Sequence, residues 1–297
     1  MLYKFLKLTS SVLLSLVLLS CSCATPGVNS NSSSNLVVPR ASFLKIDVDL
    51  VIRNCDEEGK GCSLEQGDLV SGSGFVVKRA RHHGVYVMSA AHVCDPGTYA
   101  SMIAGGRPWH LEFSGLTKEK EAYVMTVLEV DHDKDICLLY APKLERIPIK
   151  IADKRIMPGD KILNVAAPAG VLYRGAPIII DGIYNGRNHD SGHDMYTMLV
   201  AGGSSGSPIM NEEGEVIGIV SMMDMRFPFI AISPAHEDVS EFFTRAIAYH
   251  SVVREPSQIV YKLILPELPE LPALPKLPSV DIDDMELQAR EWLADLF

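Results

Sequence analysis

Three short motifs in the middle of the chain carry a histidine, an aspartate and a serine, in that order. They are SAAHVC around His92, DHDKDICLL around Asp135 and GSSGSP around Ser205. A serine hydroxyl is a weak nucleophile, which attacks a carbonyl carbon when a histidine accepts its proton and a carboxylate orients that histidine. The motifs therefore predict a catalytic triad with His92 as general base and acid, Asp135 as the orienting carboxylate and Ser205 as the nucleophile.

The serine motif also predicts a binding site for a negatively charged oxygen. Its two glycines permit a tight turn that exposes the serine hydroxyl and directs backbone N–H groups toward the same spot. Fixed donors of this kind each lower the barrier of acyl transfer by roughly 3 to 4 kcal/mol. We expect the N–H groups of Gly203 and Ser205 to form this oxyanion hole.

Three aspartates compete to orient His92. Asp135 borders the apolar run ICLLY and can reach a semi-buried position, whereas Asp131 and Asp133 belong to a polar turn. His92 itself follows the strand-like run GVYVMSA directly, so that a rigid element would hold its ring in place. The pattern favours Asp135 as the partner of His92.

Two further groups of chemically active side chains predict no site. His189 and His193, together with the pair His82 and His83, fall short of a zinc ligand set, and the segment GRNHDSGHD is typical of a solvated loop. Cys94 is not a suitable nucleophile for the predicted base, because residues two apart on a strand or at a helix start do not face each other. We expect neither a metal nor a cofactor.

Many short β-type runs, separated by turn residues, surround these motifs. Examples are FLKIDVDLVI, GVYVMSA, ICLLYA and APIIIDGIY. Such spacing is typical of all-β barrels and sandwiches. The first helix with a clear start follows Ser233 and Pro234, where the serine would cap the helix and the proline would occupy its first position.

The order His, Asp, Ser along an all-β chain matches the double-barrel proteases, whereas α/β hydrolases and subtilisins use other orders. From about Ser42 to His250 the chain resembles trypsin-like serine proteases of the bacterial HtrA/Deg and V8-like type. Besides the triad motifs, the resemblance rests on GSGFVV, PGDKILNVAAPAG, NEEGEVIGIVS and FIAISP. It implies two six-stranded antiparallel β-barrels with a C-terminal helix, and a serine endopeptidase that acts on protein or peptide substrates. The alternatives are a catalytically silent protease fold used for binding or structure, and a non-proteolytic acyl hydrolase.

The resemblance also implies a substrate pocket lined by Leu199, Ser221, Met222 and Met223. No acid stands among these residues to attract lysine or arginine, and methionines form adaptable apolar pockets. Val220 stands near the position where V8-like enzymes carry the histidine on which cleavage after glutamate depends. We therefore expect small or medium apolar side chains on the acyl side of the scissile bond.

Length and composition describe an ordinary globular body. The chain has 297 residues, of which 47% are hydrophobic and 22% charged, which excludes wholesale disorder and a polytopic membrane protein. Its 27 basic and 37 acidic residues give a net charge of -10, the wrong sign for a nucleic-acid binder.

The N-terminus has the pattern of a secretion signal. Lys4 and Lys7 precede an apolar run that is too short to span a bilayer, and LLSC resembles the lipobox of bacterial lipoproteins, in which the cysteine is lipidated. Cys21 is the predicted lipid anchor to the membrane, with an ordinary cleaved signal or a hydrophobic anchor as the alternatives. We expect an exported protein, a cell-envelope or periplasmic lipoprotein or otherwise a secreted one.

Export places the cysteines in an oxidising compartment, where thiols that can reach each other form disulfides. Cys55 and Cys62 bracket CDEEGKGC between two β-like runs, which predicts a disulfide at a hairpin tip. Cys94 and Cys137 stand in apolar contexts where unpaired buried thiols are common, so that their pairing stays open at this point.

The C-terminal tail is of a different kind. LPELPELPALPKLP repeats proline every third residue, the period of polyproline II, and DIDDMELQAREWLADLF has the spacing of an amphipathic helix. This helix either packs on its own domain or docks onto a partner or a second copy. The predicted segments are a signal peptide (1–20), a flexible tether (21–41), a trypsin-like protease domain (42–250, with barrel one at about 42–150, barrel two at about 151–235 and a helix at 236–250), a Pro-rich linker (251–280) and the amphipathic helix (281–297).

Overall fold

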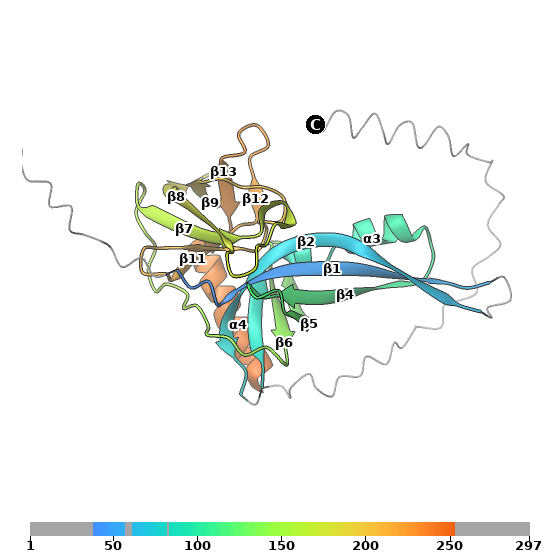
Figure 1. Ribbon diagram of the computed structural model, residues 1–297. Coiled ribbons are helices and arrows are strands. Elements are labelled where there is room, and N and C mark those ends of the chain that lie inside the picture. The colour runs from blue at the N-terminus through green and yellow to red at the C-terminus, as the bar shows by residue number, and fades with distance from the viewer. Residues whose placement is uncertain (1–37, 57–60, 82, 253–297) are drawn as a thin grey trace, which may run out of the picture. The chain divides into compact units, whose positions relative to one another are not determined.

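The computed structural model describes residues 38–56, 61–81 and 83–252 (Figure 1). The predicted signal peptide, the lipidation candidate Cys21, most of the tether, His82, and the Pro-rich linker and terminal helix beyond residue 252 lie outside the described residues. Within the described ranges, no helix is long and apolar enough to cross a membrane.

The first half is a closed antiparallel barrel of six strands in the order β1-β2-β3-β6-β5-β4. Every residue of β3 and β6 is buried, because both strands are continuous apolar runs that line the barrel core. The strands are β1 (Phe43–Asn54), β2 (Ser63–Arg79), β3 (Val85–Ser89), β4 (Trp109–Leu116), β5 (Ala122–Asp131) and β6 (Ile136–Ala141).

The first two strands continue beyond the barrel as a long arm (Figure 1). A disulfide joins Cys55, which follows β1, to Cys62, which precedes β2, and this is the pair that the sequence pattern predicts. The helix α3 (Gly97–Ala104) packs against the arm through buried Ala100 and Ala104, which contact Leu50 and Ile52 of β1 in a small separate core. The helix α3 therefore supports the arm through apolar contacts with β1.

The second half is a sheet of seven strands in the order β11-β10-β7-β8-β9-β13-β12. Its two edge strands belong to one chain segment, interrupted only at Val220 and Ser221: the N–H of Val220 donates to Ser207 O, whereas the N–H of Ser221 donates to Ile232 O. The segment changes partner there, so that six chain segments form seven strands. The strands are β7 (Lys161–Ala166), β8 (Ile178–Arg187), β9 (Asp194–Thr197), β10 (Pro208–Met210), β11 (Val216–Ile219), β12 (Met222–Met223) and β13 (Ile230–Ser233).

The all-β class is therefore confirmed, together with the C-terminal helix. The predicted second six-stranded barrel differs in detail, because the partner change at Ser221 divides one expected strand into β11 and β12. The helix α4 (His236–Val252) joins the halves, since Val239 and Phe242 share one core with Phe43 of the first barrel and Val216 of the second.

The start of α4 corrects one expectation. Ser233 does not cap the helix, because its hydroxyl accepts the N–H of Ile219 and donates to Pro234 O. The carboxylate of Asp194 instead accepts the N–H of His236 at 3.0 Å. The hydrogen-bond acceptor at the start of α4 is thus Asp194 of β9, 42 positions earlier in the chain, and not Ser233 as the local sequence predicts.

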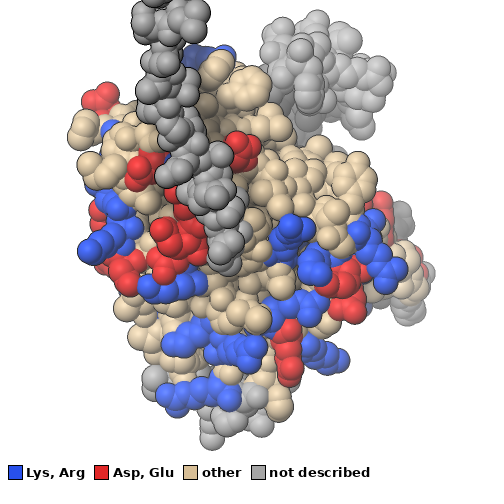
Figure 2. Space-filling model, turned by 60° about the vertical axis from the view of Figure 1, so that its left-hand side comes forward, with Lys and Arg blue, Asp and Glu red and all other residues tan. Residues whose placement is uncertain are grey.

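The surface mixes charges of both signs. Acidic and basic side chains lie side by side on the face shown in Figure 2. Several form exposed ion pairs, such as Lys150 with Asp153 and Arg245 with Glu129. Such pairs contribute about 0 to 1 kcal/mol each, so that the apolar cores rather than these contacts hold the fold together.

Candidate active site

His92 lies on α2 (Ala91–Cys94), a single helical turn that follows β3 after one residue. Its neighbours Ala91 and Val93 are buried, whereas the imidazole is half exposed, with 47% of its side chain accessible. The small side chain of Ala91 lets the chain turn directly below the ring. The strand and the turn therefore present one titratable ring at the surface between the two halves.

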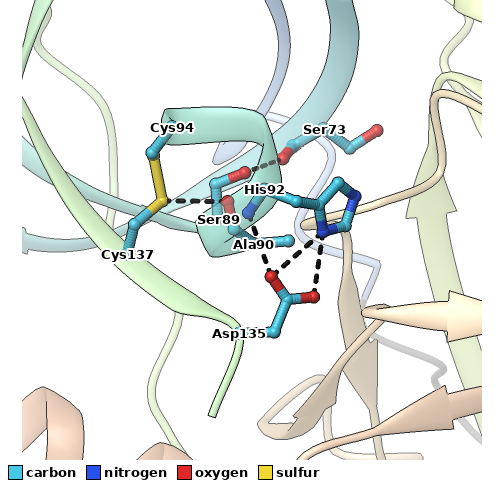
Figure 3. Close-up of a disulfide and its surroundings, with 7 residues drawn as sticks. All are labelled: Ser73, Ser89, Ala90, His92, Cys94, Asp135 and Cys137. Carbon is cyan, nitrogen blue, oxygen red and sulfur yellow. Dashed lines mark hydrogen bonds and ion pairs between the residues drawn. A yellow bond between two sulfur atoms is a disulfide. The ribbon is translucent and has the colours of Figure 1, made fainter. Parts of the chain in front are cut away.

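The imidazole of His92 is paired with Asp135 (Figure 3). Its Nδ1 lies 2.9 Å from Oδ2 and 3.0 Å from Oδ1, and the backbone N–H of His92 donates to Oδ1 at 3.0 Å. An ionised carboxylate only accepts hydrogen bonds, so Nδ1 carries the proton that is donated to it. This leaves Nε2 with a free lone pair, as a general base requires.

Asp135 precedes β6 and is partly buried. Its carboxylate also accepts a hydrogen bond from the hydroxyl of Ser221. Burial acts to raise the pKa of Asp135, but the hydrogen bonds from His92 and Ser221 outweigh it and hold the pKa below the ordinary value. The group therefore stays ionised at neutral pH.

The competing aspartates lie elsewhere. Asp131 ends β5 and accepts the N–H of Lys134 within the turn, and Asp133 is exposed. The structure thus places Asp135 against His92, whereas Asp131 and Asp133 make no hydrogen bond to it among the described residues.

Ser205 stands in a turn whose flanking glycines have left-handed backbones. Gly203 has φ 88° and Gly206 has φ 84°. A Cβ atom on Gly206 would lie 2.1 Å from Ser89 Oγ and 2.9 Å from Ala90 N, so the turn packs closely against the segment that leads to His92. Two hydrogen bonds hold it to β2: Ser73 N–H donates to Ser205 O, and Ser73 Oγ donates to Gly203 O.

Among the described residues, two half-buried N–H groups of this turn have no protein acceptor, and the N–H of exposed Gly202 also lacks one. Within the described part of the chain, the N–H groups of Gly203 and Ser205 donate to no protein atom, whereas those of Ser204, Gly206 and Ser207 donate to Ala201, Val220 and Ser204 carbonyls. Buried or half-buried amides are paired almost everywhere in proteins. An exception at two positions of one turn is the pattern expected of an oxyanion hole.

The predicted pocket residues divide into two groups. Leu199 and Met222 are exposed, at 52% and 46%, and their side chains are accessible to a ligand. Met223 is partly buried against the second-barrel core. Ser221 is buried, and its hydroxyl donates to the carboxylate of Asp135.

Sequence reasoning missed the loop that joins β12 to β13. Met225, Phe227 and Phe229 of this loop are all about half exposed or more, and the rings of Phe227 and Phe229 lie 5.5 Å apart. Met198 N–H donates to Phe229 O, which places the loop beside Leu199. The available sign in the sequence was the run FPF, because aromatic residues close together in a predicted loop can form the exposed apolar patch that marks an interaction surface.

The described residues that the sequence offers for a metal site or a cysteine nucleophile have other surroundings in the structure. His189 lies exposed between β8 and β9, and the described residues contain no group of three or more His, Cys, Asp or Glu side chains that could hold a metal ion. Cys94 is joined to Cys137 by a disulfide and is no nucleophile.

Residues 72–219 match the family described as "Trypsin-like peptidase domain". The chain is 26% identical over 176 residues to "Probable periplasmic serine endoprotease DegP-like" of Marinomonas sp. (strain MWYL1), covering 57% of this chain and 33% of the relative. It is 27% identical over 161 residues to "Serine protease HTRA3" of Mus musculus, covering 51% of this chain and 32% of the relative. The matched region therefore spans about a third of the length of these curated relatives.

Among solved structures, the serine endoprotease from Yersinia pestis is similar with a TM-score of 0.52 and 16% sequence identity, over 73% of this chain and 67% of that one. At this identity the likeness shows the fold alone.

Proposed function

This chain carries a trypsin-like peptidase domain and belongs to the trypsin-like peptidases, and on that premise we propose that it is a serine endopeptidase acting through His92, Asp135 and Ser205. The observation that carries the proposal is the hydrogen bond from His92 Nδ1 to Asp135, which leaves Nε2 free to accept a proton. We propose residues 42–250 as the bounds of the peptidase domain.

The proposed reaction has two halves. Ser205 Oγ attacks the carbonyl carbon of the scissile peptide bond while its proton passes to His92 Nε2, and Asp135 stabilises the imidazolium that forms. The tetrahedral oxyanion accepts hydrogen bonds from the N–H groups of Gly203 and Ser205. His92 then gives its proton to the leaving amine, and a water molecule, activated by the same histidine, hydrolyses the acyl-enzyme.

The preferred substrate residue follows from the exposed apolar side chains among the predicted pocket residues and the loop between β12 and β13. Leu199 and Met222 are exposed next to a loop that presents Phe227 and Phe229. Apolar side chains gain about 25 cal/mol per Å² of surface that they bury. We propose that the enzyme prefers an apolar residue on the acyl side of the scissile bond.

A panel of fluorogenic peptides that differ only at this residue tests the preference. We expect kcat/KM for leucine, methionine or valine to exceed that for lysine or glutamate by at least about tenfold, since one extra apolar contact in a pocket is worth ~1 to 3 kcal/mol. Met222→Glu should reduce the preference, while Met157→Glu, at an exposed methionine away from this loop, should leave it unchanged. Faster cleavage after glutamate by the wild type would contradict the assignment.

For location, we propose an exported protein held to the membrane by a lipid on Cys21. The leader pattern and the periplasmic relative support it. Fractionation of cells that express Cys21→Ser should move the protein from the membrane to the soluble fraction, because a covalent acyl chain supplies the binding. Membrane retention of Cys21→Ser would instead indicate an uncleaved hydrophobic anchor. The partner or self-association role of the terminal helix stays a prediction.

A further inference from the structure

Two triad residues each stand two positions before a cysteine, and the two cysteines are joined. Cys94 follows His92 and Cys137 follows Asp135, and a disulfide connects them with their Cα atoms 6.4 Å apart. Figure 3 shows Cys94 and His92 projecting from opposite sides of α2, with Asp135 below the ring. The bond thus links the two short segments that carry the base and its orienting carboxylate.

Neither of the two segments has a backbone conformation that is stable on its own. The helix α2 has four residues and no side-chain cap, and helices this short have little intrinsic stability. Asp135 has φ 52°, a left-handed conformation that is unfavourable for residues other than glycine. Neither the turn nor the left-handed residue fixes the distance between the imidazole and the carboxylate.

Regular structure also ends just before the pair. In the β3–β6 ladder the last register pair is Ser89 with Cys137. His92 and Asp135 lie beyond this pair, where no further strand hydrogen bonds hold the two segments together. The disulfide stands at the end of the ladder, and Cys137 Sγ lies 3.1 Å from Ala90 O, at the first residue of the turn into α2.

We propose that the Cys94–Cys137 disulfide is a covalent clamp that positions His92 against Asp135 for proton transfer. The inference rests on the proposed peptidase function. The two cysteines are positioning residues, because both belong to the core of the first barrel and act through the segments that they join.

The clamp is built to persist in the folded protein. Cys94 is 4% exposed and Cys137 is fully buried. Thiol–disulfide exchange needs a thiolate to reach one of the sulfurs, so burial protects the bond from mild reductants. By contrast, the disulfide of the arm has an exposed partner in Cys62, and it offers a natural comparison at a distance from the triad.

The test removes each disulfide in turn and measures steady-state kinetics on one peptide. Cys94→Ala/Cys137→Ala should lower kcat by about 10- to 100-fold with KM unchanged within about twofold, because small displacements of a proton acceptor act on the chemical step. The matched control Cys55→Ala/Cys62→Ala should keep kcat within about twofold. A second clamp variant, Cys94→Ala/Cys137→Val, restores buried volume without the bond, and its kcat should stay low.

A second readout is independent of turnover. The proton on His92 Nδ1 should give a sharp downfield ¹H NMR signal in the wild type and in the arm variant, and a broadened or absent one in both clamp variants. Folded clamp variants that keep both the signal and full kcat would overturn the proposal. If the wild type shows the signal but cleaves no peptide and binds no serine-directed probe, the proposed function fails while the clamp is still tested by the signal.

Discussion

Ser205→Ala should lower kcat for peptide cleavage by about 10⁴- to 10⁶-fold, and His92→Ala should do the same. The first removes the proposed nucleophile, and the second removes the base that we propose accepts its proton. Because the two side chains act as one unit, the double variant should be no slower than either single variant. Turnover of a fluorogenic peptide, measured beside circular dichroism to show an intact fold, checks the result.

The chain supplies close controls for both substitutions. Ser204→Ala, one residue from the nucleophile, should retain most activity, since the Ser204 hydroxyl only accepts a long hydrogen bond from Ala201 N–H. His132→Ala should be silent, because His132 is exposed and pairs with Asp95. Undiminished cleavage by folded Ser205→Ala would remove the proposed nucleophile. Absence of cleavage by the wild type would favour a protease fold used for binding.

Asp135→Asn should lower kcat by about 10⁴-fold with little change in KM. Its amide can donate to Nδ1, which favours the tautomer that carries the proton on Nε2 and so removes the base from the serine. The side chain keeps its size, and the loss therefore belongs to the proton position rather than to packing. Asp133→Asn, an exposed neighbour, should have no effect. Loss of activity in Asp133→Asn with a fully active Asp135→Asn would overturn the assignment.

The same carboxylate shapes the pH profile of the wild type. The hydrogen bonds from His92 and Ser221 outweigh burial and lower the pKa of Asp135, so that it is ionised throughout the range in which an imidazole titrates. The acid limb of log(kcat/KM) against pH should therefore fall with a slope of one, because Asp135 takes up no proton in this range. A slope of two would mean that the carboxylate of Asp135 also takes up a proton.

The sequence predicts the site where the evidence is local. His92, Asp135 and Ser205 could be proposed because each has a characteristic neighbourhood of small, apolar or glycine residues. The all-β fold could be predicted because strands such as β3 and β6 are continuous apolar runs bounded by turns. These patterns are local in the sequence, so they can be recognised without knowing which segments contact each other in the fold.

Features that depend on distant contacts could not be predicted in the same way. Ser221 reaches Asp135 across 86 positions, from the point where its chain segment changes partner between β11 and β12. The pairing of Cys94 with Cys137 depends on the β3–β6 register. The cap of α4 by Asp194 likewise comes from another strand. In each case folding, rather than the local pattern, selects the partner.

The most direct test of the central claim is the reaction of the folded protein with a fluorophosphonate probe, followed by mass spectrometry of its peptides. An activated serine displaces fluoride from phosphorus and keeps the probe as a covalent adduct. The account predicts one adduct, on Ser205, whose formation slows sharply in His92→Ala and disappears in Ser205→Ala. An adduct on a different serine, or none on folded wild-type protein, would contradict it.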